Sequence, residues 1–507
     1  MKFAVALYHG EFEKSAFEKT QKWISALDTN LEYFEIQKTT VTELLENLIA
    51  GAENQNAESV IYTWSDCPFL DLELTKELCQ QHEKYGAEYT FADGYPYGIT
   101  PEIIHLGTLK ILLQLSKQNQ DLGEGKVSRT SIFDLIKKDI NSFEIETLIS
   151  DKDFRLSRLE FASGTKFGKI LCERFEKLIE AEEKKLGKTL CATEKCELAE
   201  KSSEILQVLP GFYNLQIAAG CHGSCDYCPY PNACKNHFGK NPAEITKNDD
   251  FAFMDFSNFQ KFLEKASNFS DKAVISLSLW GEPLLHPDFP KFVKAILENP
   301  KFSVLIETSG ENLSLELIKE ISEIKKSSKP RENQYPPVIW ILSFDAGTEN
   351  LYKVLHPNSK KTYSELLELS SILETEFPEE QGVKAVYKQF VRLTENEYEL
   401  EQFFRGNKNP LIQKYDNFQN RLPNRKPADL TPINRYPCWH LRRDISVLID
   451  GSVPLCREHL FENILGNAFT DSLEEIFQKL KNPLIEQINC EYKGLCANCD
   501  EYYTFNF

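Results

Sequence analysis

Residues 218–231 read AAGCHGSCDYCPYP and place three cysteines, Cys221, Cys225 and Cys228, in one short loop. Three thiolates can bind three irons of a cubic 4Fe–4S cluster and leave an open site on the fourth iron. An iron with an open site can chelate a substrate, whereas four cysteines would close every position of an electron-carrying cluster. The loop therefore predicts a cluster that binds a second molecule directly.

Two other interpretations fit part of this pattern. Cys225 and Cys228 form a C-x2-C pair that is typical of a zinc knuckle, but its second ligand pair would have to be Cys234 and His237. A structural disulfide is disfavoured because cysteines scattered elsewhere in the chain indicate a reducing compartment. The spacing favours the open cluster over both.

From residue 211 onward, strand-like segments alternate with helix-like segments. We expect apolar strands within 213–219, 272–280, 302–308, 338–344 and 383–393, and amphipathic helices within 256–266, 289–299, 313–324 and 362–374. This alternation predicts an α/β fold in which helices cover a parallel sheet. In such a sheet or barrel, the reactive groups collect at the carboxyl ends of the strands.

The spacing C-x3-C-x2-C, with the aromatic Tyr227 just before Cys228, resembles that of the radical S-adenosylmethionine (SAM) superfamily. The resemblance implies a partial (β/α)6 TIM-like barrel and a 4Fe–4S cluster whose open iron binds the amino and carboxylate groups of SAM. One electron from the reduced cluster then splits the sulfonium into methionine and a 5′-deoxyadenosyl radical. A flavodoxin- or ferredoxin-type protein would supply that electron.

The end of the second expected strand, Trp280-Gly281-Glu282-Pro283, resembles the Gly-Gly-Glu motif of this superfamily, with Trp280 in place of the first glycine. Gly281 would allow close backbone approach, and the Glu282 carboxylate would accept hydrogen bonds from the SAM ammonium group. Taken alone, the motif could be a strand-end turn with a solvated glutamate. Its place one helix after the cysteine loop favours the SAM-binding role.

Three later strand ends extend the resemblance. Glu307-Thr308-Ser309-Gly310 is similar to the family's Thr-Asn-Gly, Ser343-Phe344-Asp345 is similar to its Ser-x-Asp, and Gln389 lies on a strand like its penultimate one. The resemblance implies this set of SAM contacts: Tyr227, Gly281, Glu282, Ser309, Ser343 and Gln389.

A second group of cysteines lies near the C-terminal end and resembles the SPASM extension of radical SAM enzymes, which binds auxiliary 4Fe–4S clusters. Its members are Cys438, Cys456, Cys490, Cys496 and Cys499, and residues 442–456 are expected to form a hairpin that turns at Asp450-Gly451. The full SPASM pattern has more cysteines and two clusters, so five cysteines favour one auxiliary cluster. The preferred ligands are Cys438, Cys456, Cys496 and Cys499, with Cys490 as an alternative. A structural zinc on the same thiolates is the other interpretation.

Residues 1–180 resemble sugar-nucleotide and cytidylyl transferases with a GT-A-like fold. In that family the aspartate of a motif like Asp66-Cys67-Pro68 helps to hold a metal, and a motif like Pro96-Tyr97-Gly98 precedes a helix. The chain departs from the family at its start, KFAVALYHGEF, which has one glycine and no basic partner in the loop to cradle phosphates. We therefore expect a degenerate domain that binds a substrate or a partner and transfers no nucleotide.

The length of 507 residues indicates two to four domains. We expect a nucleotidyltransferase-like domain at 1–180, a helical connector at 181–210, a radical SAM core at 211–430 and a SPASM-like domain at 431–507. The net charge of −19 opposes a general affinity for nucleic acids and anionic membranes. The start does not resemble a signal peptide and no apolar run reaches the length of a membrane span, so we expect a cytoplasmic protein.

Together these features predict a radical SAM enzyme that abstracts hydrogen from a peptide or a small-molecule substrate. Two alternatives come from other classes of protein. A nucleotidyltransferase with an accessory iron–sulfur module would need a phosphate-binding loop. A non-catalytic metal-binding scaffold would bind zinc and leave SAM intact, which iron and sulfide analysis can test.

Overall fold

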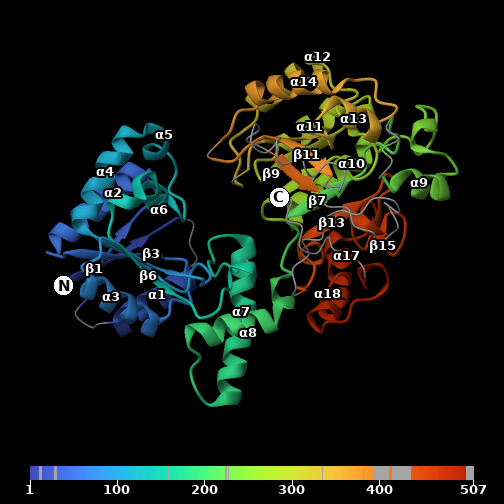
Figure 1. The fold of residues 1–507 in the computed structure, drawn as a ribbon. Coiled ribbons are helices and arrows are strands. Elements are labelled where there is room, and N and C mark those ends of the chain that lie inside the picture. The colour runs from blue at the N-terminus through green and yellow to red at the C-terminus, as the bar shows by residue number, and fades with distance from the viewer. Residues whose placement is uncertain are drawn as a thin grey trace. The chain divides into compact units, whose positions relative to one another are not determined.

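The computed structural model describes residues 1–10, 14–27, 31–157, 159–222, 225, 228–333, 335–380, 382–391, 410–413, 435–497 and 499. The chain divides into two compact units, Met1–Val208 and Leu209–Phe507. Each unit contains one large sheet flanked by helices (Figure 1), and the second unit also contains a two-stranded sheet.

The first unit contains a six-stranded sheet with the order β2-β1-β3-β5-β4-β6. The strands are β1 (Phe3–Tyr8), β2 (Tyr33–Ile36), β3 (Ser59–Trp64), β4 (Tyr89–Asp93), β5 (Glu102–His105) and β6 (Ile145–Ile149). The helices are α1 (Lys14–Leu27), α2 (Val41–Asn54), α3 (Leu72–Tyr85), α4 (Leu106–Gln118), α5 (Gln120–Gly123), α6 (Ser131–Ile136), α7 (Lys166–Leu186) and α8 (Ala192–Lys201). Strand β5 is antiparallel to both of its neighbours, and the other pairs are parallel.

Strand β1 is buried on both faces because its side chains alternate between two apolar layers. Ala4 and Ala6 belong to the layer that contains Leu44 of α2 and Leu109 of α4. Val5 and Leu7 belong to the opposite layer, with residues from α1 and α3. The sheet therefore lies between two helical layers.

The segment expected as a connector, 181–210, contains the end of α7, all of α8 and the 3-10 turn η3 (Ser203–Leu206). Helix α7 begins well before it, where the Thr165 side chain accepts a hydrogen bond from the Gly168 N–H, and it ends at Gly187 in the left-handed region. Residues 181–208 of this segment belong to the first unit.

The second unit contains a seven-stranded sheet with the order β12-β11-β10-β9-β8-β7-β13, in which all pairs are parallel. The strands are β7 (Phe212–Leu215), β8 (Ala273–Ser276), β9 (Phe302–Thr308), β10 (Val338–Ser343), β11 (Val386–Val391), β12 (Pro410–Gln413) and β13 (Asp444–Val447). The helices that alternate with them are α9 (Tyr230–Phe238), α10 (Phe256–Phe269), α11 (Phe289–Leu297), α12 (Leu315–Lys326), α13 (Glu349–Leu355) and α14 (Tyr363–Glu376). This order confirms the expected helix-covered parallel sheet.

Helix α10 illustrates why the alternation in the sequence was informative. The Asp255 side chain accepts a hydrogen bond from the Asn258 N–H and so caps the first turn. Phe259, Phe262 and Ala266 then recur at helical spacing on the buried face. The cap starts the helix, and the apolar stripe holds it against the core.

The C-terminal part contains α16 (Trp439–Arg443), β14 (Ser452–Pro454), β15 (Ile464–Asn467), α17 (Leu473–Lys479) and α18 (Lys481–Ile488). The expected turn at Asp450-Gly451 is present, since the Gly451 N–H donates to the Leu448 carbonyl over 2.9 Å and the Leu448 N–H donates to the Ser452 carbonyl over 2.8 Å. The expected strand pairing is wrong. Strand β13 pairs with β7 and β14 pairs with β15, because the wholly buried residues of β13 suit a parallel sheet covered by helices better than an exposed hairpin.

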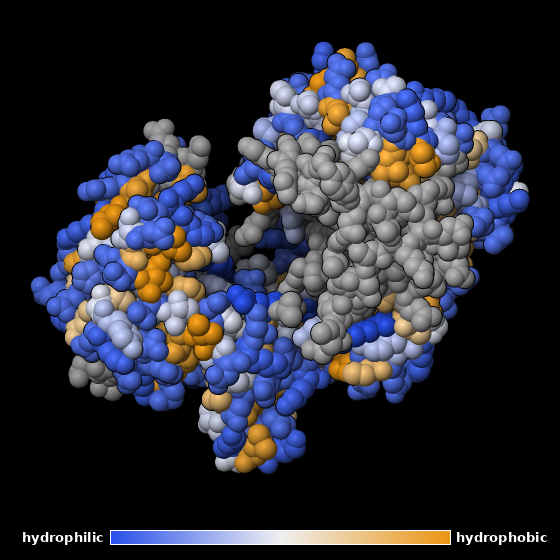
Figure 2. Space-filling view, in the orientation of Figure 1, coloured by the Kyte–Doolittle hydropathy of each residue, from blue (hydrophilic) through white to orange (hydrophobic). Residues whose placement is uncertain are grey.

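The surface visible in Figure 2 is largely hydrophilic, with separate apolar patches. Exposed large apolar side chains such as Tyr85, Ile149 and Val354 occur in both units. None of the helices within the described ranges combines the length and the apolar composition that crossing a bilayer requires.

Candidate functional site

The three-cysteine loop follows β7, at the carboxyl end of the first strand of the large sheet. The Cys221 N–H donates to the Pro242 carbonyl over 3.2 Å, and the Cys228 N–H donates to the Cys225 carbonyl over 3.0 Å. All three cysteines are partly exposed. Tyr227, the predicted SAM contact in the same loop, lies outside the described residues.

Tyr230 anchors this loop to the strand before it, a role that sequence reasoning missed. Its hydroxyl donates to the Ala219 carbonyl over 2.8 Å and accepts from Gln216 Nε2 over 2.9 Å. Burial raises the pKa of Tyr230, and the neighbouring thiols, Cys221 and Cys228 among them, raise it further. The protonated phenol therefore lies beside two of the three predicted ligands.

Gly281 and Glu282 lie directly against the chain that enters the loop. Gly281 has a φ of +91°, and a Cβ there would lie 2.1 Å from the Ala218 carbonyl oxygen, so only glycine fits. The Glu282 N–H donates to the Gly220 carbonyl over 2.8 Å. The strand-end motif and the cysteine loop are therefore joined next to Cys221.

The Glu282 carboxylate is 2% exposed and is held by four donors. Oε1 accepts from Thr308 Oγ1 (2.7 Å) and the Leu284 N–H (3.2 Å), and Oε2 accepts from the Ser309 N–H (3.0 Å) and Ser309 Oγ (2.7 Å). Burial raises the pKa of Glu282, and these hydrogen bonds partly oppose that shift. All four donors are neutral, so they orient the carboxylate and leave its charge uncancelled.

The other predicted SAM contacts lie at the ends of neighbouring strands. Ser343, at the end of β10, is paired in register with Gln389 of β11. Gln389 Nε2 donates to Glu307 Oε1 of β9 over 2.9 Å. The structure thus brings Glu282, Ser309, Ser343 and Gln389 onto one edge of the sheet, as the parallel arrangement requires.

A buried histidine connects this edge to the cysteine loop. His356 Nδ1 lies 3.2 Å from Cys225 Sγ, and His356 Nε2 lies 3.0 Å from Asp345 Oδ2. Burial opposes the charged imidazole, but the bonds to Asp345 and Cys225 outweigh it and raise the pKa of His356 to about 10. Sequence reasoning missed His356, since a lone histidine after a short helix carries no spacing signal.

Three of the predicted auxiliary ligands lie close together in the C-terminal part. Burial and, to a smaller extent, the nearby Cys496 thiol raise the pKa of Cys438 to about 12. The pKa of Cys456 is also raised, first by burial and Glu458 and then by Cys438 and Cys496. These mutual effects show that the three thiols share one neighbourhood.

The two remaining candidates differ in exposure. Cys499 is partly exposed. Cys490 is exposed and has a φ of +60°. The contrast favours Cys499 as the fourth ligand.

Trp280, which replaces the family's glycine, connects the two cysteine-bearing regions. Its Nε1–H donates to the Arg457 carbonyl over 2.8 Å, directly after Cys456. Its ring stacks on Tyr230 with centroids 6.0 Å apart, and its φ of +48° is unusual for a bulky residue. The contacts on both sides of the indole hold this conformation in place.

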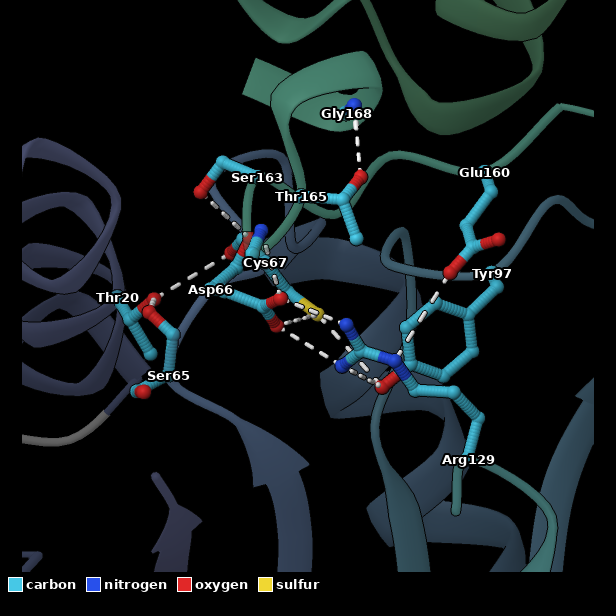
Figure 3. A network of polar contacts seen from close by, with 11 residues as sticks. Thr20, Ser65, Asp66, Cys67, Tyr97, Arg129, Glu160, Ser163, Thr165 and Gly168 are labelled. Carbon is cyan, nitrogen blue, oxygen red and sulfur yellow. Dashed lines mark hydrogen bonds and ion pairs between the residues drawn. The ribbon is translucent and has the colours of Figure 1, made fainter. Parts of the chain in front are cut away.

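In the first unit, the carboxylate of Asp66, which was predicted to bind a metal, forms an ion pair with an arginine. Arg129 Nη1 lies 2.9 Å from Asp66 Oδ1 and Nη2 lies 2.6 Å from Oδ2 (Figure 3). The Gly164 N–H also donates to Oδ2, over 3.0 Å, and the guanidinium lies over the rings of Trp64 and Tyr97. Asp66 is 1% exposed. The pair is internal and bidentate, which is the geometry of a structural ion pair.

The thiol groups fit the clusters that the sequence predicts. The described residues include no group of three or more His, Cys, Asp or Glu side chains placed to hold a single metal ion. A 4Fe–4S cube attaches each thiolate to a different iron, so its cysteines do not converge on one point. Two separate sets of neighbouring cysteines, one on a partly exposed loop, are the donors that such cubes use.

Comparisons with known proteins agree with these features. The radical SAM superfamily model matches residues 215–373, and the model of SPASM, an iron–sulfur cluster-binding domain, matches residues 438–500. An uncharacterized protein of Treponema pallidum (strain Nichols) is 34% identical over 386 residues, which cover 74% of this chain and 98% of that protein.

Two solved structures align at low similarity. Streptococcus suis SuiB bound to S-adenosylmethionine aligns with a TM-score of 0.41 and 15% identity, over 69% of this chain and 88% of SuiB. A cytidylyltransferase from Leptospira borgpetersenii serovar Hardjo-bovis aligns with a TM-score of 0.31 and 12% identity, over 40% of this chain and 96% of the other. The GT-A-like fold of the first unit stays a prediction.

The matched ranges contain the residues described above. The range 215–373 includes the cysteine loop, Glu282, Ser309, Ser343 and His356, and the range 438–500 includes the five C-terminal cysteines. The cofactors that follow are a 4Fe–4S cluster, SAM and an auxiliary iron–sulfur cluster. The chain belongs to the radical SAM superfamily and carries a SPASM domain, and its activity is the reductive cleavage of SAM for radical chemistry.

Proposed function

We propose that Cys221, Cys225 and Cys228 hold the 4Fe–4S cluster and that Glu282 binds the ammonium group of SAM beside it. The hydrogen bond between the Glu282 N–H and the Gly220 carbonyl supports this assignment, because it fixes the carboxylate next to the first cysteine. When bound, the cluster and SAM supply a 5′-deoxyadenosyl radical. The chain orients SAM and excludes water around it.

The residues around Glu282 offer polar groups for SAM to contact. The buried carboxylate offers a full negative charge to the ammonium group, and a charge-assisted bond of this kind is stronger than a neutral one. Ser309, Ser343 and Gln389, from neighbouring strand ends, supply hydroxyl and amide groups for the rest of the molecule, and Tyr227 is assigned to the same site by its place in the loop.

Cys438, Cys456, Cys496 and Cys499 are assigned to one auxiliary 4Fe–4S cluster, which relays an electron or binds the substrate. The shared neighbourhood of Cys438, Cys456 and Cys496 supports this set. A flavodoxin- or ferredoxin-type protein supplies the electron. The substrate is a peptide or a small molecule, and the net charge of −19 disfavours nucleic acid as a partner.

The cluster assignment is tested by iron analysis of the anaerobically reconstituted full chain. Two cubes require about eight irons per chain, and changing Cys221, Cys225 and Cys228 together to Ala should halve that number. The same variant should form no 5′-deoxyadenosine from SAM and dithionite. Stoichiometric zinc in place of the second set of irons would contradict the auxiliary assignment.

The substrate class is tested by following the abstracted hydrogen. Extract from cells grown in heavy water is divided into peptides and small molecules, and each fraction is incubated with reduced enzyme and unlabelled SAM. Deuterium in the 5′-deoxyadenosine identifies the fraction that contains the substrate. Deuterium from neither fraction would contradict hydrogen abstraction from both of these classes.

The first unit is assigned a binding role without nucleotidyl transfer. The bidentate pair with Arg129 leaves Asp66 with no free charge for a metal ion. The full chain should therefore release no pyrophosphate from the four common nucleoside triphosphates with magnesium and sugar-phosphate acceptors. Pyrophosphate release that disappears in Asp66→Ala would make the protein bifunctional and overturn this assignment.

A further inference from the structure

His356 approaches the sulfur of a predicted cluster ligand from inside the protein. Its Nδ1 lies 3.2 Å from Cys225 Sγ, within hydrogen-bonding distance for sulfur, and the histidine is 8% exposed. It is the first residue after α13, in a segment that follows β10. The contact therefore joins the SAM edge of the sheet to the cysteine loop.

The imidazole is held in this orientation from several sides. The backbone N–H of His356 donates to the Tyr352 carbonyl over 2.8 Å, and the centroids of the Tyr352 and His356 rings lie 4.7 Å apart. On the far side, Nε2 lies 3.0 Å from Asp345 Oδ2. The ring can therefore turn little without breaking one of these contacts.

Asp345 is itself fixed in a conformation that a non-glycine residue rarely adopts. It is fully buried, has a φ of +57°, and its N–H donates to the Gln389 carbonyl over 3.1 Å. A residue held in this left-handed region is strained, and it persists where its surroundings hold it. The placement of the Asp345 carboxylate behind the histidine is thus a stable feature of the fold.

The donors and acceptors define the protons on the ring. A carboxylate only accepts, so the His356 nitrogen that faces Asp345 carries a proton. A cysteine sulfur bound to iron has no proton to donate, so a bond between it and Nδ1 requires an N–H at Nδ1. The imidazole then carries a proton on both nitrogens: Nε2–H forms the ion pair with Asp345, and Nδ1–H donates to the sulfur.

We propose that His356, positioned by Asp345, donates an Nδ1–H hydrogen bond to the Cys225 sulfur of the SAM-binding cluster and thereby raises the reduction potential of that cluster. The inference rests on the proposed role of Cys225. Reduction adds one electron to the cluster, and a donor aimed at a ligand sulfur stabilises the added charge. His356 is a positioning residue, since it acts on the cluster through Cys225.

The hydrogen bond is tested first by pulsed EPR on the reduced, reconstituted full chain that contains 15N-labelled histidine. A weak 15N coupling to the SAM-responsive cluster signal is expected, and it should disappear in His356→Phe, which keeps a ring against Tyr352. His82→Phe, in the first unit, is the matched control and should retain the coupling. A coupling of the size given by a nitrogen bound to iron, or no coupling at all, would overturn the proposal.

The effect on potential is tested by redox titration of the same signal. In His356→Phe, the ratio of reduced to oxidised cluster at the wild-type midpoint should fall about tenfold, which is about 59 mV for a one-electron couple. His356→Gln, whose amide can donate to sulfur, should recover part of that loss. Iron content should stay at the wild-type level in both variants.

The outcomes separate this inference from the proposed function. Unchanged potentials with full iron would overturn the role of His356 and leave the cluster assignment intact. Loss of iron in both variants would show that His356 holds the loop together and would overturn the proposed effect on potential. A wild-type protein without any SAM-responsive cluster signal would instead contradict the proposed function itself.

Discussion

Asp66 in the first unit and Glu282 in the second are both buried carboxylates that follow a parallel strand, yet their partners differ. Asp66 is paired with the Arg129 guanidinium, which cancels its charge. Glu282 accepts four hydrogen bonds from hydroxyl and N–H groups, and no cation among the described residues forms an ion pair with it. Position at a strand end is therefore not enough to identify a ligand site. A buried carboxylate whose charge no cation of the protein neutralises is better evidence of a ligand site.

The largest effect is expected from removing the arginine. Arg129→Met should lower the free energy of unfolding of the first unit by about 3–5 kcal/mol, because it leaves a buried carboxylate without a partner. Urea unfolding of the full chain measures this change. The double variant Arg129→Met/Asp66→Asn should recover much of the loss, and an Arg129→Met protein as stable as wild type would show that the pair is not structural.

The next effect concerns SAM affinity. Glu282→Gln should weaken SAM binding by about ten- to a hundredfold, since a hydrogen bond to a charged group contributes about 1.5–3 kcal/mol. Asp66→Asn is the matched control and should leave SAM affinity unchanged. Equilibrium binding to the reconstituted protein measures both. Equal affinities for wild type and Glu282→Gln would remove Glu282 from the SAM site.

A smaller effect is expected from pH. Burial raises the pKa of Glu282, so the carboxylate gains a proton at a higher pH than an ordinary glutamate, whose pKa is about 4.3. SAM affinity should therefore fall as pH is lowered into the acidic range, beginning at a higher pH than an ordinary glutamate would give, and an α-ammonium group stays charged throughout that range. The affinity of Glu282→Gln should stay flat over the same range, and a parallel fall in both proteins would assign the dependence to another group.

The same raised pKa affects folding in the opposite direction. Because the folded state favours the protonated form of Glu282, this group stabilises the protein most below the pKa of the unfolded chain. That contribution is lost as pH rises through the folded-state pKa. The stability difference between wild type and Glu282→Gln should therefore shift in favour of Gln as pH rises, which unfolding at several pH values measures.

The smallest effect is expected from substituting Trp280, two residues before Glu282. Trp280→Phe keeps an aromatic ring against Tyr230 but loses the bond to the Arg457 carbonyl, so stability should fall by about 0.5–1.5 kcal/mol. SAM affinity should stay at the wild-type value, because the four donors to Glu282 are untouched. A fall in SAM affinity as large as that of Glu282→Gln would mean that the C-terminal part sets the position of the carboxylate.

Local patterns in the sequence predicted much of the large sheet. Strand β9 begins and ends where expected, at Phe302 and Thr308, because a continuous apolar run between turn residues suits a buried parallel strand. The strand ends also placed Glu282 and Ser309 together, since the carboxyl ends of parallel strands share one edge. These features depend on neighbours in sequence or on the rules of a parallel sheet.

The features that the sequence did not predict depend on long-range contacts. Arg129 and His356 reach Asp66 and Cys225 from distant segments, and neither has a motif of its own. The strand-end motif taken alone also allowed a turn with a solvated glutamate, and the burial of Glu282 contradicts that interpretation. Glu282→Ala would leave four donors without their acceptor, at a cost of about 1–3 kcal/mol for each one that water cannot reach.

The pairing of β13 with β7 bears on how the protein is made. Asp444 of β13 is paired with Phe212 of β7. One edge of β7 therefore has no partner until residues near 444 have left the ribosome. An open edge of this kind invites pairing with other chains. A chain that stalls or is truncated before residue 444 should therefore aggregate, and the SPASM segment is needed for the barrel to be completed as well as for its own cysteines.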